Sequence, residues 1–150
     1  QAGQPLRLKY EAKEFGPYAK NLRQVLIRLE KHYTQGYGDG KDNPTKTIEL
    51  LPGAVEAAES FLKDDEVIRG RMDRVAKLIE GFEDGYGLEL LSSVHWVMRE
   101  NAEARESSEA AVAAVHKWNV RKRHALEKEH LLKAWERLKG QSWDVSFALD

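Results

Sequence analysis

The sequence predicts a mainly α (α+β) fold, a single helical domain of about six helices with a small two-stranded sheet from the chain ends. Two observations predict it. Apolar residues recur at helical spacing along most of the chain, and a short stretch near each end alternates apolar and polar residues. The chain has 150 residues, which is an ordinary size for one domain. We therefore expect residues 1–150 to form one domain.

The two alternating stretches lie at opposite ends of the sequence. They cover residues 6–12 (LRLKYEA) and residues 143–149 (WDVSFAL). Alternation with a period of two is typical of a half-buried strand. Two isolated strands in a helical chain are most easily stabilised by each other, so we expect them to pair.

Three helices are predicted in the first half of the chain. The Gly-Pro pair at 16–17 opens the first, because proline at a helix start loses no hydrogen bond, and the glycine-rich residues 36–40 end it. Pro52 opens the second, and the third covers about residues 66–82. The residues expected to face inward are Tyr18, Leu22, Val25, Leu26, Leu29 and Tyr33, then Val55, Ala58, Phe61 and Leu62, then Ile68, Met72, Val75, Ile79 and Phe82.

Three more helices are predicted in the second half, each with a capping signal. Asp84 is an expected N-cap, and residues 88–98 after it are apolar on nearly all sides, so this helix should be the most buried. Ser107 or Ser108 caps the fifth helix, and Gly140 ends the last one.

Composition excludes several classes of protein. The formal net charge is −1, which provides no global field for nucleic acid or an anionic membrane. There is no cysteine, and no apolar run approaches the roughly 20 residues that a membrane helix needs. We expect a cytoplasmic protein. Residues 51–100 carry 6 basic and 11 acidic side chains, a net −5, which is either a solvated helix surface or a surface for a basic partner.

No catalytic or metal-binding motif is found. His116, His124 and His130 are spaced eight and six apart, so no two share a helical turn as paired metal ligands do. His95 is expected to be a hydrogen-bonded core histidine. The loop at 39–43 lacks the glycine and the glutamate of a calcium loop. We therefore expect no metal, no cofactor and no enzymatic activity.

The basic run Arg121-Lys122-Arg123 joins the last two predicted helices and is a secondary candidate patch. A helix, a basic turn, a helix and a strand are compatible with a winged-helix-like, DNA-binding autoregulatory domain. A nearly neutral chain lacks the basic footprint that is usual for DNA-binding proteins, so direct nucleic-acid binding is the less favoured alternative.

Several strings, in order along the chain, resemble the C-terminal domain of DarG antitoxins. They are residues 16–23 (GPYAKNLR), 36–40 (GYGDG), 48–54 (IELLPGA), 78–83 (LIEGFE), 86–91 (YGLELL), 94–96 (VHW), 118–122 (WNVRK) and 134–138 (AWERL). None of them is a catalytic signature. Together with residues 5–8 (PLRL) they cover roughly the whole chain, which makes the resemblance fairly specific.

The resemblance implies an antitoxin role. A DarG antitoxin neutralises DarT, a toxin that uses NAD to attach ADP-ribose to thymidine in single-stranded DNA. A macrodomain at the N-terminus of DarG removes the ADP-ribose, and the C-terminal domain binds and blocks the toxin. This chain resembles the second part, so we expect the macrodomain and its glycohydrolase activity to be absent from it. The implied partner is a DarT-type toxin.

A mechanism follows as a hypothesis. A groove that binds single-stranded DNA has basic residues for phosphates and aromatic residues that stack on bases, so a protein with carboxylates and aromatics could occupy it instead. The alternative is that Tyr37 and Tyr86, the two tyrosines of the candidate set given next, anchor their turns on the core. The candidate partner-binding residues are Tyr37, Asp39 and Asp42 in one group, and Glu80, Glu83, Asp84, Tyr86 and Glu89 in the other.

Overall fold

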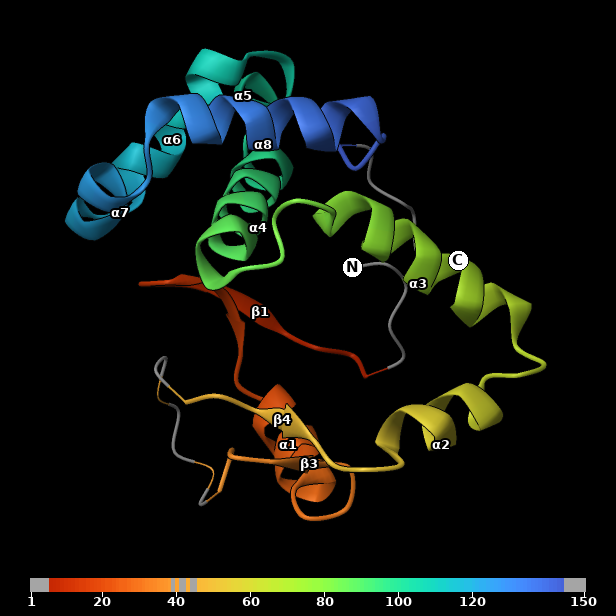
Figure 1. The fold of residues 1–150 in the computed structure, drawn as a ribbon. Coiled ribbons are helices and arrows are strands. Elements are labelled where there is room, and N and C mark those ends of the chain that lie inside the picture. Colours follow the sequence, from red (N-terminus) through yellow and green to blue (C-terminus); the bar gives the residue numbers. More distant parts are fainter. Residues whose placement is uncertain (1–5, 39, 41–42, 44–45, 145–150) are drawn as a thin grey trace. The chain divides into compact units, whose positions relative to one another are not determined.

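The computed structural model describes residues 6–38, 40, 43 and 46–144 (Figure 1). It divides the chain into two compact units, residues 1–10 with 19–73 and residues 11–18 with 74–150. Across the described residues helices dominate and the strands are short, which confirms the predicted mainly α (α+β) class. None of the helices in these ranges combines the length and the apolar character that crossing a bilayer requires.

The first unit holds α1 (Leu22–Leu29), α2 (Ala54–Phe61), the first part of α3 (Glu66–Ile79) and a small sheet. In this sheet β3 (Thr34–Gln35) pairs antiparallel with β4 (Glu49–Leu50). Gly36 follows β3 with a φ of 104°, and a Cβ atom there would lie 2.1 Å from the carbonyl oxygen of Thr47. Only glycine fits at this point of the sheet.

The first unit buries few apolar side chains. Val55, Phe61 and Met72, which were predicted to face inward, are 49%, 86% and 54% exposed. That prediction is wrong for these three residues, and also for Tyr33 and Ala58, which are exposed as well. The physical reason for Val55 and Met72 is that they line an open groove instead of a closed core, whereas Phe61 lies outside the lining of this groove. The groove is lined by Leu50, Ala54, Val55, Ala58, Glu59, Leu62, Lys63, Arg69, Met72 and Asp73.

The second unit is built around α4 (Gly85–Glu100). This helix packs against α5 (Ala102–Glu106), α6 (Ser108–Trp118) and α8 (Lys128–Gly140), while α7 (Val120–Ala125) packs on α6 (Figure 1). The prediction that this helix is the most buried is confirmed. The buried residues of its core are Leu90, Leu91, Val94, Val97 and Met98 in α4, Ala111, Val112 and Val115 in α6, and Leu131, Ala134 and Leu138 in α8.

Polar N-caps set the starts of four helices in this unit. The Asp84 carboxylate accepts a hydrogen bond from the backbone N–H of Gly87 at 2.6 Å, and the Ser107 hydroxyl caps α6 in the same way. Both caps were predicted. Asn101 and Asn119 cap α5 and α7, two short helices that apolar periodicity did not indicate.

The N-terminal strand forms a local hairpin. β1 (Tyr10–Lys13) pairs with β2 (Gly16–Ala19), so Gly16 and Pro17 begin a strand and not the predicted helix. Gly16 has a φ of 141°, which suits glycine, and a Cβ atom there would lie 3.4 Å from Oγ of Ser92 in α4. The first strand thus pairs with a neighbour along the chain, and its predicted pairing with the chain end stays a prediction. Residues 145–149 of the other predicted strand lie outside the described residues.

Candidate functional site

The connection between α3 and α4 holds three of the six predicted acidic residues, Glu80, Glu83 and Asp84. Gly81 turns the chain after α3 with a φ of 81°, and Asp84 caps α4. The first turn of α4 lies directly on this connection, because a Cβ atom at Gly87 would come within 2.7 Å of backbone atoms of Phe82. Residues 80–84 therefore form a short, tightly packed turn that we call the acidic turn.

Arg137 of α8 holds the acidic turn from within. Its Nη1 atom donates hydrogen bonds to the carbonyl oxygens of Lys77, Leu78 and Glu80 at 3.2, 2.9 and 2.7 Å. Its guanidinium also lies 5.2 Å from the ring centroid of Phe82. These carbonyls belong to the C-terminal end of α3, where they lack intrahelical partners. Arg137 therefore binds the end of α3 and the start of the turn together.

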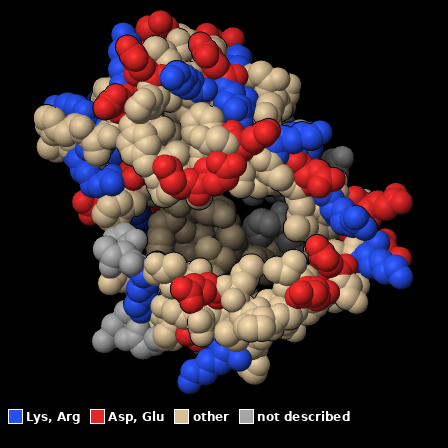
Figure 2. Space-filling view, in the orientation of Figure 1, with Lys and Arg blue, Asp and Glu red and all other residues tan. Residues whose placement is uncertain are grey.

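The carboxylates of the acidic turn point to solvent. Glu80, Glu83 and Asp84 are exposed. Asp84 is engaged in capping, whereas Glu80 and Glu83 form no ion pair with any residue that the structure describes. Figure 2 shows acidic side chains gathered where the α3–α4 connection lies in Figure 1. The turn thus presents two unneutralised carboxylates on a fixed backbone.

Tyr86 lies one residue inside α4, next to the acidic turn. Its hydroxyl shares a hydrogen bond of 2.9 Å with Nδ1 of His130 and accepts one of 3.3 Å from the backbone N–H of Glu127. The rings of Tyr86 and His130 meet edge to face at 5.7 Å. Tyr86 therefore links the starts of α4 and α8, in agreement with the alternative that this tyrosine anchors its turn. It nevertheless remains 37% exposed.

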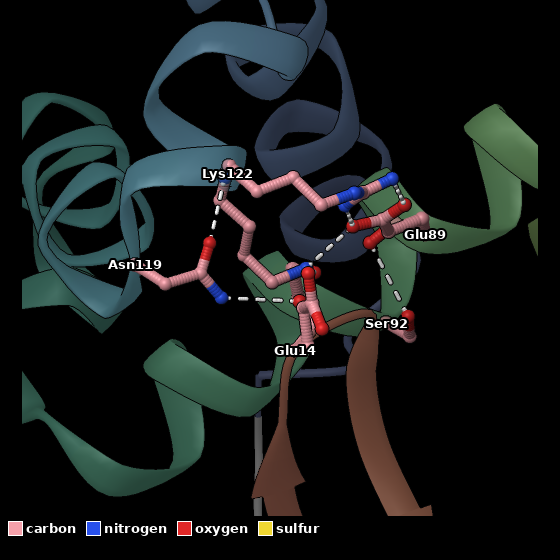
Figure 3. A network of polar contacts seen from close by, with 7 residues as sticks. Glu14, Glu89, Ser92, Asn119 and Lys122 are labelled. Atoms are coloured by element: carbon pink, nitrogen blue, oxygen red, sulfur yellow. Dashed lines mark hydrogen bonds and ion pairs between the residues drawn. The ribbon is translucent and has the colours of Figure 1, made fainter.

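Glu89, Arg121 and Lys122 form one ionic network instead of two separate surfaces, and Figure 3 shows Glu89 and Lys122 within it. The Glu89 carboxylate accepts from Nη1 and Nη2 of Arg121 at 2.6 and 3.0 Å and from Nζ of Lys122 at 2.7 Å. Lys122 is fully buried and also donates to Oγ of Ser93 at 2.9 Å. The prediction that Glu89 and Lys122 are available to a partner is wrong, because each is sequestered by the other.

This geometry shifts the pKa values of Glu89 and Lys122. Burial alone raises the pKa of the Glu89 carboxyl, but the hydrogen bonds from Arg121 and Lys122 hold that pKa below its ordinary value. Burial lowers the pKa of the Lys122 ammonium, against the opposite effect of Glu89. The basic run is consequently not an exposed basic patch. Of its three residues only Arg123 is exposed, and its Nε atom donates to the carbonyl oxygen of His116.

The first predicted group does not form a described site. Tyr37 is only 5% exposed, so its predicted availability to a partner is wrong. Its backbone N–H and that of Gly36 donate to the Glu30 carboxylate at 3.2 Å, which holds this turn on the first unit. Asp39 and Asp42 lie outside the described residues.

Phe15 is a candidate that sequence reasoning missed. It occupies the turn of the β1–β2 hairpin and is 45% exposed, and the guanidinium of Arg121 lies 4.3 Å from its ring centroid. The Nδ2 atom of Asn119 donates to the carbonyl oxygen of Glu14 at 3.1 Å and fixes the same turn (Figure 3). The only sequence signal was an aromatic residue before Gly16, at a place predicted to start a helix.

His95 and His116 contribute hydrogen bonds to the packing of the second unit. His95 donates from Nε2 to the carbonyl oxygen of Trp143 at 3.1 Å, which confirms the predicted hydrogen-bonded core histidine. Burial lowers the pKa of His95 from 6.5 to about 4. His116 donates to the carbonyl oxygen of Leu126 at 2.9 Å. In the described ranges, no three His, Asp or Glu side chains are grouped so that they could hold a metal ion.

Comparison with known proteins finds relatives of one kind. No protein-family model matches the chain. It is 42% identical over 139 residues to a DNA ADP-ribosyl glycohydrolase of Thermus aquaticus, covering 92% of this chain and 37% of that protein. It is 36% identical over 127 residues to proteins of the same name from Mycobacterium tuberculosis and Mycobacterium bovis, covering 81% of this chain and 36% of each. The chain thus spans little more than a third of the length of these relatives.

These relatives overturn the prediction that the chain is not an enzyme. Each is named as a glycohydrolase, and together they match 81–92% of this chain. The prediction rested on the lack of a catalytic motif and on the resemblance, which implied that the macrodomain with the glycohydrolase activity is absent from this chain. The proteins that carry the enzyme's name are considerably longer than this chain.

Proposed function

We propose, from relatives that support a place in the DarG family, that this chain binds a DarT-type toxin directly and blocks its access to single-stranded DNA. In this proposal residues 1–150 act as one toxin-neutralising part, in the cytoplasm where the toxin meets DNA. The acidic turn and Tyr86 enter the groove in which the toxin would otherwise hold its DNA strand. The observation that carries the proposal is the pair of exposed, unneutralised carboxylates at Glu80 and Glu83.

The chemistry of the acidic turn supports this role. Proteins that hold single-stranded DNA combine a positively charged groove with aromatic side chains on which bases stack. Glu80 and Glu83 supply negative charge, and the neighbouring Tyr86 supplies a partly exposed ring. A partner groove built for phosphates and bases would therefore meet matching groups. Complementary charges of this kind increase the rate of association and the specificity of the complex.

The rigidity of the turn supports the proposal as well. Arg137, the Asp84 cap and the packing of Gly87 on Phe82 hold the backbone before any partner arrives. A surface that is already ordered loses less conformational entropy when it binds. The acidic turn therefore loses little conformational entropy when its carboxylates bind a partner.

An ADP-ribosylation assay tests the proposal. Purified DarT-type toxin, NAD and a thymidine-containing single strand are combined with and without this chain. We expect near-stoichiometric chain to abolish modification, and excess single-stranded DNA to relieve the block. A toxin that works undisturbed would contradict the proposal. A second arm adds the chain to DNA that is already modified and freed of toxin, since loss of ADP-ribose there would show glycohydrolase activity instead of direct inhibition.

Charge reversal locates the surface. We expect Glu80→Lys with Glu83→Lys to raise the concentration needed for half-inhibition at least tenfold. The matched control is Glu100→Lys with Glu136→Lys, which changes the net charge equally at two other exposed positions of the second unit. If both double variants inhibit as the unaltered chain does, the acidic turn is not the contact surface. Circular dichroism confirms that each variant is folded.

A further inference from the structure

A second exposed aromatic residue is held in place close to the first turns of α4. Phe15 lies at the tip of the β1–β2 hairpin, between Glu14 and Gly16. The carbonyl oxygen of Glu14 accepts a hydrogen bond from Asn119, and Gly16 lies close to Ser92. Nearly half of the Phe15 side chain remains exposed although the backbone on either side is fixed. Its exposure is therefore not the result of a loose turn.

The Phe15 ring is oriented by a chain of charged contacts. Arg121 lies 4.3 Å from the ring centroid, at the distance of a cation–π interaction. Arg121 is itself held by two hydrogen bonds to Glu89, and a guanidinium bound in this way to a carboxylate has a defined plane as well as a defined position. Glu89 and Arg121 thus set where the ring lies and which face is covered.

Glu89 connects this ring to the candidate site. It follows Tyr86 by three residues in α4, and residues three apart are neighbours on a helix surface. Tyr86 is oriented by His130 on α8, and Phe15 by Arg121 on α7. Two partly exposed rings, each held by a residue far away in sequence, are therefore connected through neighbouring positions of α4, Tyr86 directly and Phe15 through Arg121 and Glu89.

We propose that Phe15 is a second aromatic contact of the toxin-binding surface, and that Arg121 and Glu89 are its positioning residues. This inference rests on the proposed function and extends its surface from the acidic turn to the hairpin tip. In this proposal the partner has a basic cleft that also holds unstacked bases. The Phe15 ring, at a fixed place, then occupies a second position at which a base would stack. Aromatic residues that are ordered before binding are favoured as anchors of an interface.

Binding of purified toxin, measured by calorimetry or biolayer interferometry, tests the inference. We expect Phe15→Ala to weaken binding at least tenfold and Phe15→Trp to restore most of it. The matched control is Phe61→Ala, which removes a more exposed phenylalanine from the first unit and should leave affinity within twofold. Melting temperatures of all variants show that each is folded, and Phe15→Leu separates loss of the aromatic ring from loss of apolar volume.

A double-mutant cycle tests the positioning role. Arg121→Met should weaken binding in the unaltered chain and have no further effect in the Phe15→Ala background, because its effect on the partner passes through the ring. Equal effects of Arg121→Met in both backgrounds would overturn the positioning role. Unchanged binding by Phe15→Ala, with tight binding by the unaltered chain, would overturn this inference alone. No binding by the unaltered chain would overturn the proposed function together with it.

Discussion

Lys122 and Glu89 form a buried ion pair in which Nζ lies 2.7 Å from Oε1. The lysine side chain is fully buried, and that of Glu89 is 11% exposed. A lysine ammonium is rarely buried without a partner, because its loss of hydration is large. Glu89 therefore stabilises α7 against α4 by making this burial possible.

Removal of the Glu89 charge should destabilise the second unit strongly. We expect Glu89→Gln to lower the free energy of unfolding by about 3 kcal/mol, because Lys122 is left buried without a counter-charge. Denaturation by urea measures the change, and Glu136→Gln, at an exposed position of α8, is the control. The double variant Glu89→Gln with Lys122→Met should be more stable than Glu89→Gln alone. Equal stability of the two would contradict the role given to the ion pair.

Stability should fall in mild acid because of His95. Its pKa is lowered to about 4 in the folded chain, so below pH 6.5 the unfolded chain binds a proton that the folded chain does not. Acidification therefore favours unfolding, by about 2 kcal/mol between pH 6.5 and pH 5. Urea denaturation at several pH values should show this slope. His95→Gln should flatten it, and a slope unchanged in that variant would assign it to other groups.

The contacts of Arg137 should determine the order of the acidic turn. We expect Arg137→Met to lower the free energy of unfolding by about 2 kcal/mol, because it leaves three carbonyl oxygens without this donor. Hydrogen exchange should become faster at the amides of residues 80–88. Arg105→Met is the matched control, since it removes a similar bond from arginine to the Met98 carbonyl and should leave exchange at 80–88 unchanged.

Two substitutions at Asp84 separate its capping role from its charge. Asp84→Ala should cost about 1 kcal/mol of stability, whereas Asp84→Asn should be nearly neutral because asparagine is also a good N-cap. Since the carboxylate is already bound to the Gly87 N–H, we expect Asp84→Asn to inhibit the toxin within twofold of the unaltered chain. A large loss of inhibition by the asparagine variant, with stability retained, would place the Asp84 charge in the interface.

Local signals in the sequence predicted those parts of the fold that depend on neighbours along the chain. The caps at Asp84 and Ser107 and the buried face of α4 are of this kind. The hairpin was missed because proline at position 17 suits a helix start as well as an edge strand. Periodicity gave no account of which helix faces would be covered, so the exposed positions of Phe61 and Met72 were not foreseen.

The candidate site divides in the same way. The exposure of Glu80 and Glu83 was predicted because a glycine-rich break in a helical pattern indicates an exposed turn. Glu89 and Lys122 were each read as surface residues, because a contact between residues 33 positions apart has no local signature. Phe15 was overlooked for the same reason, since its partner Arg121 is contributed by a different part of the chain.

The dependence of the acidic turn on α8 has a consequence for synthesis. During translation the N-terminal part of the chain leaves the ribosome first, so residues 80–84 emerge long before Arg137. Until that arginine has left the exit tunnel, the end of α3 lacks the donor that holds the turn. A product that ends early would carry every acidic residue of the turn and still lack its clamp. The acidic turn is therefore held in its binding conformation only after α8 has been translated.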